Sequence, residues 1–297
     1  MKFSVLDLSP IDKGKTANEA LYESIKLARL AEELGYYRYW VSEHHNMKHL
    51  AGSSPEVLIS SIAAQTEKIR VGSGGVMLPH YSAYKVAENF RVLETLYPGR
   101  IDLGVGRAPG GTPNVTRALQ DVAMRSINEY PDQVKDLTAY LRGEVPSGLD
   151  VRATPLGETA PDVWLLGSSG GSAALAASLG MPFMFAHFIN GYGGADITRA
   201  YQDQFMPSEK DEEPVSCVAI FVICAETEEK AEKMRPSHIG RERMILGNPT
   251  QVKEQLEQLA EDYRVDEIMV NTITGDYEAR IESYWMIAEM FLSANSR

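Results

Sequence analysis

The feature that most constrains this fold is the regular alternation of short β-rich runs with helical stretches along the whole chain. Eight such pairs follow one another. Most of the runs are near-continuous in Val, Ile, Leu and Phe, as expected for strands buried on both faces. The expected strands cover residues 3–8, 39–42, 69–76, 101–106, 163–167, 182–188, 215–225 and 267–272. This order is typical of parallel βα units rather than of separate all-α and all-β parts.

Length and composition fit one barrel. The chain has 297 residues, within the range of (β/α)8 barrels, which run from about 200 to more than 400 residues. Hydrophobic residues make up 44% of the chain, enough to fill a sizeable core. No linker or low-complexity stretch divides it, so we expect a single α/β domain over residues 1–297, folded as a TIM barrel.

The chain is acidic, with 41 acidic against 29 basic residues and a formal net charge of -12. Such a protein has no overall field that attracts nucleic acid or an anionic membrane, so we expect neither as a partner. Any phosphate must then be held by local groups. The two cysteines, Cys217 and Cys224, stand roughly 23 Å apart in one extended strand and cannot pair. The N-terminus has no secretion-signal pattern, and together these features predict a cytoplasmic protein.

Glycines and polar residues stand at the C-terminal ends of five consecutive expected strands, where barrel enzymes place their active sites. One of these ends reads GSSGGS (residues 167–172) and leads into an expected helix. Glycines, serines and a helix N-terminus together suit a phosphate. A flexible turn is the alternative, because no Walker A lysine is present. Arg107 and Arg117 are suited to the same oxyanion, although surface ion pairs would also explain them.

Two further strand ends carry unusual residues. Glu43, His44 and His45 follow the second strand, where adjacent residues point to opposite sides, so we expect one histidine, not both, at the barrel mouth. Zinc binding is the alternative, but no HxH, HExxH or cysteine-pair spacing accompanies them, and we expect no metal site. Gly74 and Gly75 interrupt the third strand, which indicates either close approach of a flat ligand or tight barrel packing.

Five segments in fixed order resemble the bacterial luciferase-like, flavin-dependent monooxygenases, a superfamily of (β/α)8 barrels that bind FMN or the deazaflavin F420. The segments are VSEHH (41–45), VGSGGVMLPH (71–80), KVAENFRVLETLYPGRIDLGVGRAPG (85–110), LLGSSGGSAALAASLG (165–180) and GNPTQVKEQL (247–256). The part that reads PGRIDLGVGRAPG is the most specific. The resemblance runs along the whole chain and is greatest to the short, single-chain FMN branch.

The resemblance implies roles for individual residues. His44 matches an active-site histidine that acts as a general acid or base near the flavin. Gly74 and Gly75 match a pair joined by a cis peptide beneath the flavin ring. The matching phosphate-binding positions are Arg107, Arg117, Ser168, Ser169, Gly170, Gly171 and Ser172. The acidic residue that luciferase has at the Ser168 position is absent.

The resemblance also predicts how the pocket is closed. The charged segment over residues 226–247, with His238 and Arg241, is expected to cover the site as a lid. His187 replaces a tryptophan of luciferase in the pocket wall. Because the lid segment is shorter than in luciferase, the resemblance argues against light emission and against a long-chain aldehyde substrate.

The activity implied by the resemblance is oxygenation of a small organic substrate by a two-component monooxygenase. A separate NAD(P)H-dependent flavin reductase would supply reduced FMN, and O₂ would be the co-substrate. We expect a homodimer, the commonest symmetric assembly. Three alternatives stay open: an F420-dependent dehydrogenase of the same fold, a flavin-binding protein without turnover, and a metal-dependent barrel hydrolase. The substrate itself is not identified by the sequence.

Overall fold

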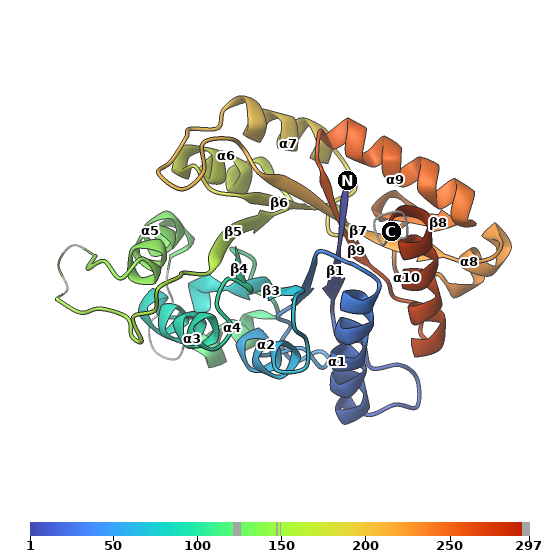
Figure 1. Cartoon of the computed structure of the whole chain (residues 1–297), viewed down its shortest axis with the longest axis horizontal. Helices are drawn as coiled ribbons and strands as arrows, with labels where there is room; N and C mark the ends of the chain where they lie inside the picture. Colours follow the sequence, from blue (N-terminus) through green and yellow to red (C-terminus); the bar gives the residue numbers. More distant parts are fainter. Residues whose placement is uncertain (121–125, 147, 149, 293–297) are drawn as a thin grey trace.

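The expected barrel is present in the computed structural model, which describes residues 1–120, 126–146, 148 and 150–292. Eight parallel strands form a closed ring in the order β1, β2, β3, β4, β5, β6, β7, β9, and β9 pairs back to β1. Helices surround the ring (Figure 1). The prediction of a (β/α)8 TIM barrel is therefore confirmed.

The ring strands and the main helices alternate as the sequence predicts. The strands of the ring are β1 Lys2–Asp7, β2 Arg38–Val41, β3 Arg70–Met77, β4 Ile101–Gly106, β5 Asp162–Gly167, β6 Phe183–Ala186, β7 Ser216–Cys224 and β9 Glu267–Asn271. The α-helices are α1 Ala17–Glu33, α2 Pro55–Ala63, α3 Ala83–Leu96, α4 Pro113–Gln120, α5 Tyr130–Leu141, α6 Gly170–Leu179, α7 Gly194–Asp203, α8 Glu228–Met234, α9 Pro249–Tyr263 and α10 Tyr277–Phe291. Short 3-10 helices are η1 Leu78–His80, η2 Ile127–Glu129 and η3 Arg241–Arg243.

The N-terminal end of the barrel is filled by paired charges. Arg38 on β2 reaches Asp102 on β4 and Glu267 on β9, with N···O distances of 2.8 and 2.7 Å. Arg70 on β3 reaches Asp102 and Asp162 at 2.5 Å each. Each of these carboxylates faces a cation, which is the condition under which buried charge is tolerated.

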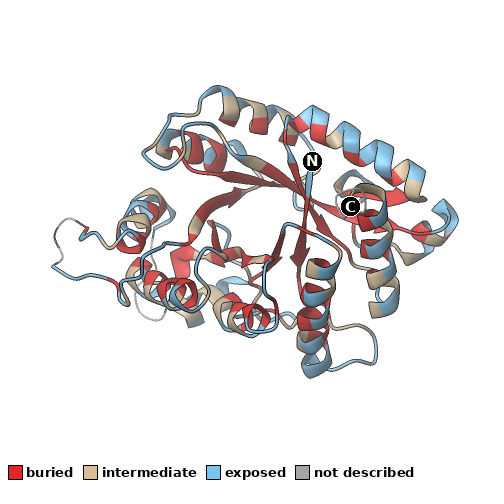
Figure 2. Ribbon diagram, viewed as in Figure 1, coloured by how far each residue is buried: buried red, intermediate tan, exposed pale blue. Residues whose placement is uncertain are grey.

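An apolar layer lies inside the ring above these charges. Its buried members include Leu6, Trp40, Trp164, Met184 and Met269. Inward-facing residues of one strand are two positions apart, as Trp164 and Leu166 are on β5, because successive side chains of a strand point to opposite faces. Figure 2 shows the strands as almost entirely buried.

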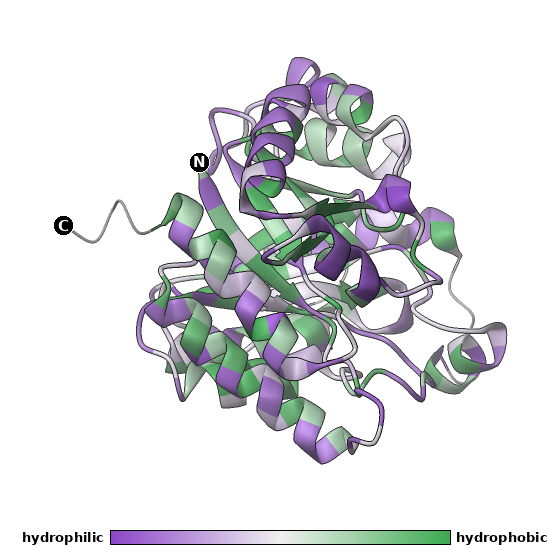
Figure 3. Cartoon of the chain, turned by 90° about the vertical axis from the view of Figure 1, so that its right-hand side faces the viewer, coloured by the Kyte–Doolittle hydropathy of each residue, from purple (hydrophilic) through white to green (hydrophobic). Residues whose placement is uncertain are grey.

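The helices bury one face each against the outside of the ring. In Figure 3 the strands are mostly hydrophobic, whereas the helices mix hydrophobic and hydrophilic residues. Helix α1 begins with a capping box, in which Thr16 accepts from the Glu19 N–H and the Glu19 side chain accepts from the Thr16 N–H. Among the described residues, no helix is long and apolar enough to cross a membrane.

The segment after β7 contains one strand that the sequence did not predict. β8 (Met244–Gly247) pairs with the C-terminal half of β7, from Phe221 opposite Met244 to Cys224 opposite Gly247. Buried side chains beneath this segment form a separate apolar cluster: Phe221, Ile223, Ala225, Ala231, Ile239, Met244 and Leu246. The segment expected to be a lid is thus packed on its own small core at the end of β7.

Candidate functional site

A cavity of about 210 Å³ opens at the C-terminal ends of β3, β4, β5 and β6. Part of its lining is bare backbone, at Gly74, Gly75, Gly106 and Gly167. Another part is apolar: Met77, Ala108, Leu166, Met184, Ala186, Phe188 and Ile189. The polar part contains Arg107, Ser168, Ser169 and Ser172. This division suits a ligand with a flat apolar body and one anionic end.

The glycine pair on β3 is required by packing as well as by the shape of the cavity. A Cβ atom on Gly74 would lie 2.6 Å from Leu6 Cδ1, and one on Gly75 would lie 2.5 Å from Leu166 Cδ1 and 2.6 Å from Gly104 O. The peptide bond between the two glycines is cis. The packing explanation of this pair is therefore confirmed, and the same two residues also form part of the cavity lining.

The polar end of the cavity combines a helix N-terminus with one arginine. Ser169 is the N-cap of α6, but its side chain makes no capping hydrogen bond. The first N–H groups of α6 therefore keep their capacity to bind an anion. Arg107 lies beside them, because a Cβ atom on Gly171 would be 3.6 Å from its Nη2. Arg107 is exposed and forms no ion pair with a described residue.

His44 lies one strand away from this cavity, after β2, which pairs with β3. Its Nδ1 is 2.9 Å from Ser42 Oγ, and its backbone N–H donates to Gly52 O at 2.8 Å. Burial, with smaller contributions from His45 and His49, lowers the pKa of His44. The neutral ring is therefore favoured near pH 7, where it is able to accept a proton. His44 is not among the described residues that line the cavity.

The remaining predicted residues also lie outside the lining. Three of them are exposed side chains: Arg117 on α4, His238 before η3 and Arg241 on η3. His187 follows β6, and its Nδ1 is 2.6 Å from Tyr263 Oη. Its Nε2 donates to Glu242 O at 2.9 Å, since a carbonyl oxygen only accepts. Burial lowers the pKa of His187. The ring thus ties the end of β6 to η3.

The apolar part of the lining was missed by the sequence argument, which looked for polar residues at strand ends. Leu166, Met184 and Ala186 all lie on the inward face of β5 and β6. Side chains two residues apart on a strand point to the same face, so the inward-facing residues can be counted in steps of two toward the C-terminal end of each strand.

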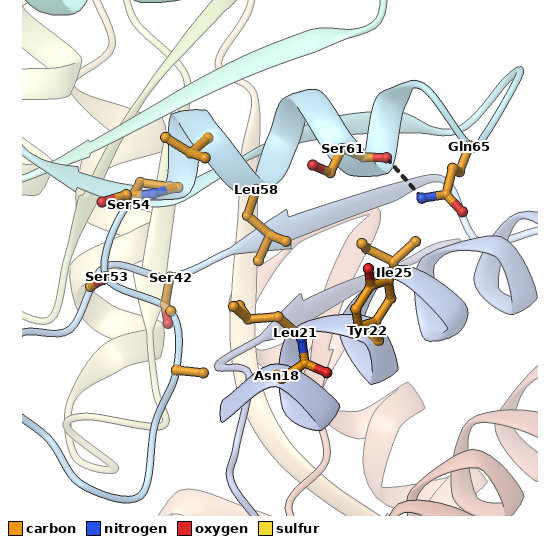
Figure 4. A pocket seen from close by; sticks show the side chains of 14 residues that line it. Asn18, Leu21, Tyr22, Ile25, Ser42, Ser53, Ser54, Leu58, Ser61 and Gln65 are labelled. Atoms are coloured by element: carbon orange, nitrogen blue, oxygen red, sulfur yellow. Dashed lines mark hydrogen bonds between the residues drawn. The ribbon is translucent and has the colours of Figure 1, made fainter. Parts of the chain in front are cut away.

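A larger cavity of about 400 Å³ lies outside the ring, between α1 and α2 (Figure 4). Its lining mixes apolar side chains such as Leu21 and Leu58 with the hydroxyls of Ser53 and Ser54. None of the described residues that line it is charged. Of these two cavities, only the smaller one offers a cation to an anionic ligand, at Arg107.

Among curated proteins, YwcH of Bacillus subtilis is 50% identical to this chain over 98% of the chain and 99% of the relative. The N-acetyl-S-alkylcysteine monooxygenase of the same organism is 37% identical, over 99% of each. Among solved structures, apo-MsnO8 has a TM-score of 0.92 and 36% identity, with 98% of each chain covered.

A more distant structure shares the fold alone. It is the oxygenating constituent of 3,6-diketocamphane monooxygenase from Pseudomonas putida, in complex with FMN, with a TM-score of 0.75, 19% identity and 97% of each chain covered. The family model described as luciferase-like monooxygenase matches residues 1–241, most of the chain. This chain is therefore a member of the luciferase-like monooxygenase family.

Proposed function

We propose that this chain is the oxygenating component of a two-component, FMN-dependent monooxygenase. The observation that carries the proposal is the cavity at the ends of β3 to β6, which has a bare glycine part, an apolar part and one cationic end. FMN has the same division, with a flat ring system at one end and a phosphate at the other. The camphane enzyme of the same fold is described as an oxygenating constituent in complex with FMN, which supports both halves of the proposal.

The residues present fit FMN. Gly74 and Gly75 would lie against the flavin ring system as bare backbone of the cavity lining. Arg107, Ser169 and the N-terminus of α6 would hold the phosphate by charge-assisted hydrogen bonds. Bound in its reduced form, FMN supplies the electrons that activate O₂. Leu166 and its apolar neighbours would exclude water from the reacting ring.

His44 is proposed to hold and move a proton beside this cavity. In the tautomer whose Nδ1–H donates to Ser42 Oγ, Nε2 has a free lone pair and accepts the proton. The lowered pKa keeps the ring in the accepting form at neutral pH. The substrate is proposed to be a small organic molecule, oxygenated at the open rim of the cavity.

Two protein partners belong to the proposal. A separate NAD(P)H-dependent flavin reductase would supply reduced FMN; the camphane enzyme, of which the solved chain is the oxygenating constituent, supports a division of the activity between constituents. A second copy of this chain would form a homodimer through α2 and α3, which pack together and leave Val57, Val92 and Leu96 66%, 45% and 59% exposed. Light scattering after gel filtration tests this arrangement, and Leu96→Glu should yield a monomer.

The decisive experiment is a titration of the purified protein with oxidised FMN, with reduced FMN under argon, and with F420. We expect reduced FMN to bind at micromolar concentration or below, and NADH to be consumed only after a flavin reductase is added. Preference for F420 would favour the dehydrogenase of the same fold. Reduced FMN that reacts with O₂ as fast as free flavin would favour a binding protein without turnover. Absence of binding by either form of FMN would end the proposal.

A further inference from the structure

Glu43 is a buried carboxylate to which the proposed chemistry assigns no role. It lies two residues after the end of β2 and directly before His44, and it is 1% exposed. A carboxylate at such a position is strongly destabilising unless hydrogen-bond donors surround it. The hydrogen-bond donors around Glu43 therefore indicate which segments of the chain it holds in place.

Three donors from three parts of the chain converge on this carboxylate. Oε2 accepts from the backbone N–H of Met77 at 3.0 Å. Oε1 accepts from His45 Nε2 and from Tyr81 Oη, each at 2.7 Å. Because a carboxylate oxygen is the acceptor in this contact, His45 donates through Nε2–H. Burial, together with the bond to Glu43, raises the pKa of Tyr81, so the phenol stays a donor.

Through Met77, Glu43 is connected to the glycine part of the cavity, where the flavin ring system is proposed to bind. Met77 is the last residue of β3, it lines the cavity, and it follows the Gly74–Gly75 pair by two residues. Its N–H is held by Glu43 at the end of the strand. The position of the bare glycine backbone is thus set partly from outside the cavity.

The His45 contact reaches the phosphate end. The backbone N–H of His45 donates to Gly110 O at 3.1 Å, in the loop that begins at Arg107. Gly110 has a φ of +59°, and a Cβ atom there would lie 3.1 Å from Met77 Cγ. The Arg107 loop therefore rests on the same two residues, His45 and Met77, that Glu43 bonds.

We propose that Glu43 is a positioning residue for the flavin, which holds the glycine part of the cavity and the Arg107 loop at a fixed distance from each other. Glu43 does not line the cavity itself. The inference rests on the proposed function, because it assumes that FMN spans these two parts. It predicts that a carboxylate outside the cavity controls affinity for a ligand it never touches.

The first test is Glu43→Gln, which keeps the shape but replaces one acceptor oxygen by an NH₂ donor. We expect the Kd for reduced FMN, measured by flavin fluorescence under argon, to rise about tenfold, the equivalent of one lost charge-assisted hydrogen bond. In parallel, ¹⁵N NMR of the ligand-free protein should show a proton on His45 Nε2 in the wild type and a changed Nε2 signal in the variant.

A double-mutant cycle with Arg107→Gln separates positioning from general loosening. If Glu43 acts by holding the Arg107 loop, the Kd of the double variant should rise by clearly less than the product of the two single fold-increases, which is the rise expected if the free-energy losses were additive. Additive losses, with a lowered Tm, would show a merely structural role and overturn the inference. An unchanged Kd in Glu43→Gln would overturn it as well.

Two further variants make the result unambiguous. Glu94→Gln alters another buried carboxylate, on α3, which accepts from the Gly99 N–H and from Thr159 Oγ1, and it should leave the Kd unchanged. Tyr81→Phe removes one of the three donors and should raise the Kd by a smaller factor, which decides the question if Glu43→Gln does not fold. Failure of the wild type to bind FMN would overturn the proposed function and this inference together. Binding by the wild type, with no change of Kd in Glu43→Gln or Tyr81→Phe, would overturn this inference alone.

Discussion

The two ends of the barrel both carry arginines, but they use them in opposite ways. At the N-terminal end, Arg38 and Arg70 are each bonded to two carboxylates inside the ring. At the C-terminal end, Arg107 is exposed beside the uncapped start of α6 and has no carboxylate partner among the described residues. A paired cation stabilises the fold, whereas an unpaired one is available to a ligand.

The difference explains how an acidic chain is suited to an anion. The net charge of -12 gives no overall attraction for phosphate. The carboxylates Asp102, Glu267 and Asp162 lie at the opposite end from Arg107 and are paired with Arg38, Arg70 and Lys210. The positive potential of Arg107 and the α6 N-terminus is therefore left uncancelled where the cavity opens.

The largest expected effect is at the paired end. Asp102→Ala would leave Arg38 and Arg70 with a missing partner and Trp40 Nε1 without its acceptor. Breaking a buried pair costs about 3–5 kcal/mol, a large part of a typical stability of about 5–15 kcal/mol. Urea unfolding followed by tryptophan fluorescence measures the loss. Asp162→Ala is the matched control, since that side chain is 39% exposed and a smaller loss is expected.

Arg107→Gln should affect binding and not stability. Loss of a charge-assisted contact to phosphate is expected to raise the Kd for FMN about 10–100-fold, while the urea midpoint stays within error. Arg117→Gln, at an exposed arginine outside the cavity lining, should change the Kd less than about threefold. Equal losses in the two variants would place Arg117 on the phosphate, and a destabilised Arg107→Gln would break the contrast between the two ends.

Gly74→Ala tests whether the cavity lining belongs to the rigid interior. The added Cβ would lie 2.6 Å from Leu6 Cδ1 and 3.3 Å from Trp40. Overpacking of this kind costs about 1–3 kcal/mol. Gly170→Ala is the control, because a Cβ atom there meets nothing within 4 Å. Thermal unfolding of both variants measures the difference, and a lower Tm is expected for Gly74→Ala. Equal Tm values for the two variants would mean that β3 moves to accommodate the added methyl group.

The smallest expected effect is on the pH dependence of stability. Burial lowers the pKa values of His44 and His187 below the ordinary value of 6.5. As the pH falls below 6.5, the unfolded chain takes up protons that the native histidines do not, so stability is full above 6.5 and declines below it. His187→Gln should flatten part of this slope in urea midpoints measured between pH 5 and 7.5. If the slope of the urea midpoint against pH is unchanged in His187→Gln, His187 does not contribute to the pH dependence of stability.

The ring was predictable because its signals are local. Val/Ile/Leu runs mark strands that are buried on both faces. β8 was not predictable, because it is four residues long and lies within a polar stretch. Its burial comes from β7 and the cluster around Phe221, which are contacts that no local pattern encodes.

The site shows the same limit. Polar residues at strand ends indicated Arg107 and the Ser168–Ser172 turn, and the structure brings these two together at one end of a cavity. The sequence did not show that His187 has both ring nitrogens engaged, since Tyr263 lies 76 residues away. The role of Glu43 was equally hidden, because its donors belong to β3 and to the residue that follows η1.

The uncapped start of α6 has a further consequence, for the amount of protein in a cell. A ligand held by those N–H groups and Arg107 binds the folded chain and not the unfolded one. At a ligand concentration 100 times its Kd, such binding adds about 2.7 kcal/mol to the free energy of unfolding. Chains made when flavin is scarce would lack this protection and be degraded sooner, so the abundance of the protein would follow the flavin supply.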